Sequence, residues 1–432
     1  FVENRSYIPI NTIFMKYLLG FLFSVSFSLG FSQQYIHGVV VDEGTGTPVP
    51  LANVVLKGSY TGTATNFDGE FVINISDDHL KDTLIISVVG YKTGELPVPD
   101  YVGEKFHRVL LKPFVFEMSD VTIETKSLLY NTMIKKAAEA IKDNYHQGPF
   151  NYDLYYRNSQ TENSKVSKER QAAVRLYDSK GYEQSNTFQV FKERGYDFLQ
   201  VRRSFELNSL TDGSTQLDDL LEFDIVRHRA NVLNTDYIYD DYDVDLARIT
   251  EVDGDSVFVL KFTCKNPGLS NSGDNYVKKY SGKIYIKKKD NAIIKYEAQY
   301  ECSNYSNLGR SLYVNEAKQN YKPMTIVYNV TTRYKEFNGA YFLSSIAYER
   351  KHKWKHKQGN NTKSETINAE LLVTEITVKN PQAIPNRAYY EEVPFDEKFW
   401  ESFNYLRDEK KKEEASQKTK PSGGKKQGKK KR

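Results

Sequence analysis

The stretch TNFDGEFVINISDDHLKDTLIISVVGYKT, residues 65–93, decides the fold of the N-terminal part of the chain. Residues 66–69 (NFDG) are a turn signal, and the side chains of residues 70–75 then largely alternate between apolar and polar, as in a strand with one buried face. Residues 84–89 are a more continuous apolar run that predicts a second, more deeply buried strand, which ends at Gly90, where the chain must bend. These features predict a small β-sandwich.

Short strands punctuated by Gly and Pro extend this pattern back to residue 34. The segments that carry a family resemblance are GVVVD (38–42), PLANV (50–54), TATNFDGEF (63–71) and SVVGY (87–91), followed by FEMSDVTI (116–123). Together they resemble the carboxypeptidase-regulatory-like domain over about residues 34–124. The resemblance implies a seven-stranded, transthyretin-like sandwich of the kind found at the N-termini of TonB-dependent outer-membrane transporters and other envelope proteins, with 116–123 as its exit strand.

Asp68, Gly69 and Gly90 are interpreted as structural turn residues. Gly69 allows a positive φ after Asp68, and Gly90 allows a tight bend before an aromatic residue. The chain departs from the family pattern in having Asn66 where Asp is commoner. The alternative is that Asp68 and Glu70 bind a ligand or metal ion, although such residues are usually turn formers.

Length and composition favour a strand-rich protein of more than one domain. A chain of 432 residues is too long for one ordinary core, so two or three domains are expected. The 32 Tyr and 24 Phe, against four Met, favour strands over helical bundles. The net charge of +4 is unevenly placed, because residues 408–432 carry +7 and residues 1–32 carry +1, which leaves −4 for residues 33–407. The basic balance therefore belongs to the C-terminal tail.

Residues 15–32 have the features of a secretory signal peptide. Lys16 precedes a short apolar run, residues 17–29, and small residues then lead to Gln33, the expected start of the mature chain. A membrane anchor is the alternative, but this run is shorter than the about 20 residues needed to span a bilayer. Residues 1–14 make no sense upstream of a signal, so Met15 is the expected true start. The protein is expected to be exported to the periplasm or the outer-membrane surface.

The sandwich, residues 33–125, is expected to be followed by an α+β domain, residues 126–407, with a large antiparallel meandering sheet. A helix is predicted from Ser127 to about Lys142, with an apolar stripe of Leu129, Met133, Ala137 and Ile141 that Ile134 and Ala138 widen. Residues 171–177 fit a strand or a helix. Turns at 290–291 and 338–339 make the later strands antiparallel neighbours. The predicted strands are 150–157, 257–262, 282–287, 293–298, 324–334, 341–349 and 370–378.

Further resemblances cover parts of this second domain. The rhythm of its strands is similar to the curved sheet of periplasmic lipoprotein carriers. Residues 144–157 (NYHQGPFNYDLYYR) resemble a segment that follows the sandwich in other exported proteins with this N-terminal domain. Residues 395–406 resemble the aromatic segment that closes the same region in larger relatives, so Trp400 and Phe403 are expected to dock on the sheet.

Residues 408–432 consist mainly of Lys, Glu, Ser and Gly, carry no large apolar side chain and are expected to be a disordered basic tail. A solubilising role and peripheral docking on anionic lipid or lipopolysaccharide are the two interpretations. The tail has no interleaved aromatic residues, so no nucleic-acid partner is expected.

No catalytic or metal-binding set is recognisable in the sequence. No His is followed three residues later by Glu, as a zinc carboxypeptidase would require, and neither a Gly-x-Ser-x-Gly elbow nor a phosphate-binding glycine loop occurs. His352 and His356 would share one face of a strand, but their Lys neighbours repel a cation. Residues 240–245 (DDYDVD) lack the glycine of a calcium loop, and a charge-rich loop is the alternative. No catalytic residue, metal or cofactor is therefore expected.

Cys264 and Cys302 are the only cysteines, and both lie at predicted strand ends. An exported compartment favours a disulfide between them, which would stabilise the fold by ~4 kcal/mol in the chain-entropy model. Two buried thiols are the alternative.

The sequence supports three functional hypotheses. The first is a non-enzymatic envelope protein that acts by binding or scaffolding a partner, which is another envelope protein, a glycan or a lipid. The second is a carrier of lipid or another hydrophobic ligand, which requires an apolar pocket within residues 255–378. The third is a hydrolase, which requires a cleft that gathers His228 with acidic residues between 218 and 245. The oligomeric state is not predicted.

Overall fold

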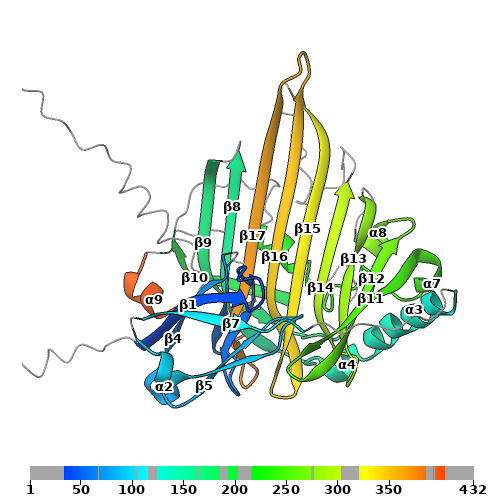
Figure 1. Cartoon of the computed structure of the whole chain (residues 1–432). Coiled ribbons are helices and arrows are strands. Elements are labelled where there is room, and N and C mark those ends of the chain that lie inside the picture. Colours follow the sequence, from blue (N-terminus) through cyan, green and yellow to red (C-terminus); the bar gives the residue numbers. More distant parts are fainter. Residues whose placement is uncertain are drawn as a thin grey trace, which may run out of the picture.

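The computed structural model of the chain describes residues 34–66, 68–103, 105–114, 124–162, 165–184, 193–202, 216–273, 277–302, 321–385, 393 and 395–403. The predicted upstream extension (1–14), signal (15–32), exit strand (116–123) and basic tail (408–432) lie outside these residues. The protein is mainly β, as predicted, with small N-terminal sheets beside a tall, curved sheet (Figure 1).

The N-terminal domain is the predicted sandwich. One sheet has the strand order β4 (Glu70–Ile75), β1 (Gln34–Asp42), β7 (Phe106–Leu111), and the other has the order β3 (Gly62–Ala64), β2 (Asn53–Leu56), β5 (Thr83–Ser87), β6 (Gly94–Pro97). The alternation read in the sequence of β4 is confirmed, because Phe71, Ile73 and Ile75 are buried in the core between the sheets. The short elements η1 (Asp77–His79) and α2 (Val98–Tyr101) complete this domain.

The turn between β3 and β4 is held by Asn66. Its Oδ1 accepts hydrogen bonds from the backbone N–H groups of Asp68, at 3.0 Å, and Glu70, at 2.8 Å. The Asp68 side chain is exposed. Gly69 has φ +74°, and a Cβ on it would lie 2.5 Å from the carbonyl oxygen of Val40, so the position requires glycine. Gly90 has φ +99°, as its predicted bend requires.

The second domain is built on a ten-stranded antiparallel sheet. Consecutive strands pair from β11 to β17, as the predicted meander requires, and β17 then pairs with β8, which continues to β9 and β10. Asn338 (φ +51°) and Gly339 (φ +80°) form the predicted turn of the longest hairpin. In sheet order the strands are β10 (Arg194–Arg202), β9 (Lys165–Asp178), β8 (Phe150–Glu162), β17 (Thr362–Thr377), β16 (Ala340–His356), β15 (Tyr321–Phe337), β14 (Ile293–Cys302), β13 (Val277–Lys287), β12 (Asp255–Cys264) and β11 (Tyr242–Val252).

The predicted helix is present, with corrected boundaries and a corrected buried stripe. It is α3 (Glu124–Glu139), followed by the short α4 (Ile141–Asn144). The buried apolar positions are Tyr130, Ile134 and Ala137 of α3 and Ile141 of α4, whereas Leu129 is 57% exposed. Tyr130, and not the predicted Leu129, therefore packs the beginning of the helix against the core. The remaining helices of this domain are α6 (Gln216–Leu221), α7 (Ile238–Asp241), α8 (Leu269–Ser272) and α9 (Glu397–Ser402).

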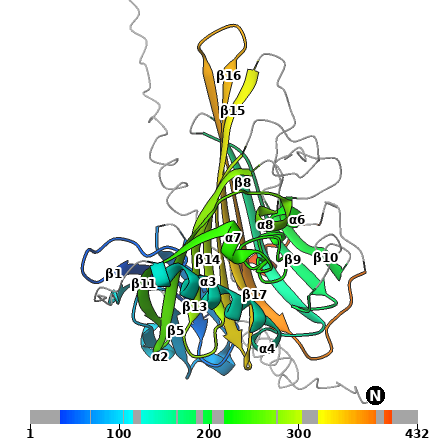
Figure 2. The ribbon, with the colours of Figure 1, turned by 90° about the vertical axis from the view of Figure 1, so that its right-hand side faces the viewer.

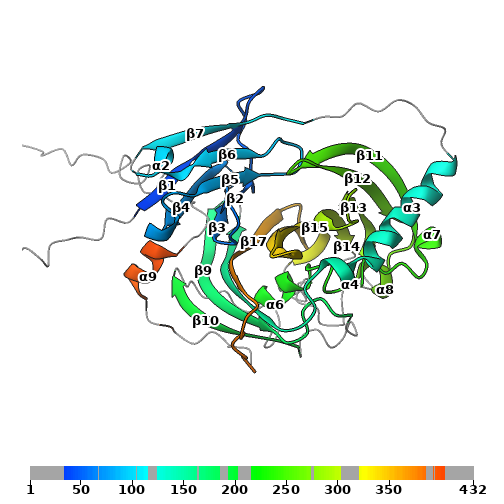
Figure 3. The same cartoon turned by 90° about the horizontal axis from the view of Figure 1, so that it is seen from below.

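The large sheet is covered on both faces. Figures 2 and 3 show α3, α4 and α6 inside its curve, on what we call the inner face, and the sandwich outside the curve, on the outer face. On the outer face, Ala64 of the sandwich packs in one buried cluster with Tyr155, Leu372 and Trp400 of α9. Trp400 therefore docks on the sheet as predicted, and Phe403 packs against the same cluster.

Cys264 and Cys302 do not form the predicted disulfide. Both thiols are buried, one at the end of β12 and the other at the end of β14, and β13 lies between these strands. Strands separated by one neighbour are about 9.5 Å apart, whereas bridged cysteines need Cα atoms within about 7 Å. The disulfide prediction was wrong because the two cysteines lie at the same end of the sheet but on strands that are not neighbours.

Candidate functional site

The inner face of the sheet is filled by its own aromatic side chains. Tyr300 stacks on Tyr280 and on Tyr328 with ring centroids 4.6 Å apart in both pairs. The hydroxyl of Tyr296 makes hydrogen bonds with those of Tyr280, at 2.6 Å, and Tyr300, at 2.9 Å. Burial raises the pKa of Tyr280 and Tyr296 well above 10, so both remain neutral. These tyrosines thus fill the interior of the sheet, and their hydroxyl groups form hydrogen bonds with one another.

Residues 222–237, between α6 and α7, form a segment that enters the curve of the sheet, and we call it the interior plug. Phe223 stacks on Tyr348 of the sheet at 5.6 Å, and its backbone carbonyl accepts a 2.7 Å hydrogen bond from Thr332. Asp224 accepts a 2.9 Å hydrogen bond from the hydroxyl of Tyr334. The plug is therefore bonded to the strands that it covers.

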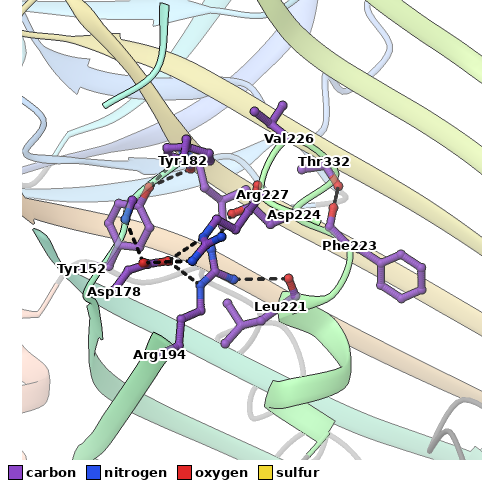
Figure 4. A network of polar contacts seen from close by, with 12 residues as sticks. Tyr152, Asp178, Tyr182, Arg194, Leu221, Phe223, Asp224, Val226, Arg227 and Thr332 are labelled. Atoms are coloured by element: carbon purple, nitrogen blue, oxygen red, sulfur yellow. Dashed lines mark hydrogen bonds and ion pairs between the residues drawn. The ribbon is translucent and has the colours of Figure 1, made fainter. Parts of the chain in front are cut away.

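A buried ion-pair network fixes the plug to the neighbouring strands (Figure 4). Arg194 of β10 donates 2.8 Å hydrogen bonds to Asp178 of β9 and to Asp224 of the plug. Arg227 of the plug donates to Asp178 at 3.1 Å and also bonds to Glu193. Burial alone would raise the pKa of Asp178, but the two guanidinium groups lower it overall.

This arrangement bears on two of the functional hypotheses. The described inner face holds packed tyrosines and the plug at the place where a lipid carrier needs an apolar cavity. His228 and the acidic residues named by the hydrolase hypothesis lie in different surroundings. His228 is buried in the plug, and Asp224 forms an ion pair with Arg194. Asp243 lies on β11, 3.5 Å from Lys265. In the described part of the chain, the inner face is therefore filled where a carrier would need its cavity, and His228 is not brought together with Asp224 or Asp243.

The predicted metal alternatives also find no assembled ligand set. Among the described residues, no group of three or more His, Cys, Asp or Glu side chains is placed to hold a metal ion. His352 is buried and packs on Trp354 with ring centroids 4.0 Å apart, and the ring of His356 accepts a hydrogen bond from the backbone of Gln358. Asp68 and Asp243 likewise belong to no such group.

Two hollows in the described part of the chain deserve comparison as candidate sites. One, of about 770 Å³, lies beside α3 and α4 and is lined by Leu233, Asp236 and Leu269, with Arg229 at its edge. Arg229 is satisfied by the backbone carbonyls of Val226 and Tyr182, both at 3.3 Å. The buried guanidinium of Arg229 is therefore already used by the protein itself.

The second hollow, which we call the junction pocket, has a volume of about 590 Å³ and lies where the sandwich meets the outer face of the sheet. The sandwich is seated here by Tyr60, whose hydroxyl donates a 2.7 Å hydrogen bond to the carbonyl of Leu343. Ser344 donates a 3.1 Å hydrogen bond to Asn53. The lining contributed by the sandwich includes Val55, Ile85 and Val88, and the sheet contributes Val252, Arg333, Lys335 and Phe337.

Arg333 and Lys335 are the unusual residues of the junction pocket. They lie two residues apart on β15, so both side chains point to the outer face. Arg333 is only 8% exposed, and its Nε and Nη1 atoms are buried without a hydrogen-bond partner. The Nζ atom of Lys335 is also buried without a hydrogen-bond partner and lies 4.9 Å from the ring centroid of Tyr60. Burial lowers the pKa of Arg333 and lowers that of Lys335 to about 8.

The carboxylates near these two cations are engaged elsewhere or exposed. Glu297 binds Lys295 at 2.5 Å and Tyr285 at 2.9 Å. Asp255 pairs with Lys287 at 2.6 Å, and Glu95 with Lys57 at 3.1 Å. Asp253 and Glu336 are exposed at the rim of the pocket, where Asp253 accepts a 2.7 Å hydrogen bond from Thr93. The pocket therefore has cations in its floor and solvated carboxylates at its edge.

Comparison with known proteins identifies the N-terminal domain. Residues 36–123 match the family model of the CarboxypepD_reg-like domain, so this part of the chain is such a domain. It is 40% identical over 84 residues to the TonB-dependent receptor SusC of Bacteroides thetaiotaomicron and 35% identical over 86 residues to the TonB-dependent receptor P39 of Formosa agariphila. Each match covers 19% of this chain and only 8% of the receptor.

The chain as a whole has a weaker likeness among solved structures. A DUF1329 family protein from Desulfovibrio piger is matched over 57% of this chain and 93% of that protein, with 12% identity and a TM-score of 0.22. That score is too low to define a common fold. Among the described residues, no helix has both the length and the apolar character needed to cross a bilayer.

The buried network leads to a prediction about stability. Arg194→Met leaves the carboxylates of Asp178 and Asp224 without their shared guanidinium, so we expect the free energy of unfolding to fall by about 3 to 5 kcal/mol. Arg175→Met is the matched control, because Arg175 makes a 2.7 Å pair with Asp153 but is 37% exposed, and its loss should cost about 1 kcal/mol or less. Denaturant unfolding measures both values. Equal losses would contradict the anchoring role of the network.

Lys335 leads to a prediction about pH. Its folded pKa of about 8 lies below the ordinary 10.5, so the unfolded state binds more protons between these values and the contribution of Lys335 to stability rises with pH. Lys335→Met should therefore raise the free energy of unfolding at pH 7, with a gain that shrinks towards pH 10. Unfolding of both proteins at pH 7, 8, 9 and 10 measures this, with Lys353→Met as the exposed control. A loss of stability at pH 7 would contradict the burial of an unpaired ammonium.

Proposed function

We propose that this is a non-enzymatic, exported envelope protein that acts by binding, and that the junction pocket is its binding site. The observation that carries the proposal is a pocket of about 590 Å³, formed where the sandwich meets the sheet, with two cationic side chains whose buried nitrogen atoms lack hydrogen-bond partners. A volume between about 300 and 1,000 Å³ is typical of small-molecule sites, which commonly lie between domains.

The proposed location is the periplasm or the outer-membrane surface. It is supported by the signal-like residues 15–32 and by the CarboxypepD_reg-like domain shared with TonB-dependent receptors. Scaffolding of an envelope protein or glycan is compatible with the same location. The junction pocket makes ligand binding the more specific proposal, because a scaffold has no need of cations buried without partners.

The test is native mass spectrometry of the full chain purified from its own envelope without denaturation. We expect a non-covalently bound small molecule that is released on unfolding. Thr93 lies at the pocket, so Thr93→Trp should reduce the bound fraction at least tenfold, while Thr93→Ser, which keeps the hydroxyl bonded to Asp253, should retain it.

Two outcomes would contradict the proposal. One is wild-type protein that carries no small molecule and is not stabilised by an extract of the envelope. The other is a bound molecule that Thr93→Trp retains in full, which would place the ligand elsewhere on the protein.

A further inference from the structure

We infer that the junction pocket binds an oxyanion, a carboxylate or phosphate group on a small molecule with an apolar body, through Arg333 and Lys335. This inference rests on the proposed function and adds the chemical class of the ligand. It concerns two residues of one strand that the sequence patterns did not single out.

Arg333 and Lys335 destabilise the fold as they stand. A buried charged group without a hydrogen-bond partner destabilises a fold, and such groups normally pair with an opposite charge. The carboxylates within reach do not provide that partner, because Glu297 and Asp255 are bonded to Lys295 and Lys287. The ring of Tyr60 offsets only part of the cost for Lys335.

The side chains of Arg333 and Lys335 are placed to share one ligand group. Side chains two residues apart on one face of a strand lie about 7 Å apart, close enough for their ends to converge on one group. A planar guanidinium suits two oxygens of one carboxylate or phosphate, and an ammonium adds a point charge. Both residues line the same hollow, so one anion can reach both.

Much of the remaining lining of the junction pocket is apolar. Val55, Ile85, Val88, Val252 and Phe337 present apolar surface to the same pocket. The volume of about 590 Å³ exceeds what a free phosphate or carboxylate ion needs. A ligand with an oxyanion at one end and an apolar chain or ring at the other matches both parts of the lining.

The experiment measures thermal stabilisation of the full chain by three probes at constant ionic strength, with sodium chloride as reference. The probes are octanoate, inorganic phosphate and octanol. We expect octanoate to stabilise most, phosphate less and octanol not at all. Arg333→Met and Lys335→Met should each weaken the apparent affinity for octanoate at least tenfold, whereas Lys353→Met, on the exposed part of β16, should leave it unchanged.

The comparison of probes separates the possible sources of the anion. Stabilisation by phosphate but not by octanoate would support an oxyanion site and would contradict the proposal that the ligand has an apolar body. If Arg333→Met does not fold, Lys335→Met and the charge-preserving Arg333→Lys decide the matter, because Arg333→Lys should retain part of the octanoate effect.

Two results would overturn the inference. One is equal stabilisation by octanol and octanoate with no effect of either substitution, and the other is no stabilisation by any anion. Either result leaves the proposed function standing if a neutral molecule is released from the purified protein and lost in Thr93→Trp. Loss of the proposed function is recognised separately, by the absence of any bound molecule.

Discussion

The burial of β15 on both faces is the constraint on which the rest of the structure depends. Its inward residue Tyr334 is bonded to Asp224 of the interior plug, and its outward neighbours Arg333 and Lys335 lie beneath the sandwich. The inner side is closed by tyrosines and by a charge network whose members satisfy one another. The outer side is closed by apolar contacts and Tyr60, but it leaves cationic nitrogen atoms unsatisfied. The unsatisfied cationic nitrogen atoms on the outer side are therefore where we propose that the ligand binds.

Much of the fold was predictable because local signals coincided with tertiary structure. Alternation identified β4, turn residues identified the hairpin at Asn338-Gly339, and the sandwich was recognised from its motifs. The errors arose where the decisive contact is distant in sequence. The face of α3 was misjudged at Leu129, and the spacing of Cys264 and Cys302 depended on β13 lying between their strands.

The candidate site was not predictable in the same way. Within TTRYKEF, residues 331–337, two cations alternate with other side chains, a pattern that normally means a solvated strand face. Only the position of the sandwich, whose Tyr60 bonds to Leu343 across 283 positions of sequence, turns that face into a pocket floor. The acidic and histidine residues that were candidates for metal binding or catalysis lie instead in structural networks or at the surface. Two cationic residues on one strand of a multidomain chain can therefore be identified as a candidate site only when the arrangement of the domains is known.

The most direct measurement of the central claim is a crystal structure of the full chain grown in sodium selenate, with selenium located by its anomalous scattering. The account predicts a selenate ion in the junction pocket, with oxygen atoms within about 3 Å of nitrogen atoms of both Arg333 and Lys335. A pocket without selenate, in which these nitrogen atoms bond to protein carboxylates, would contradict it.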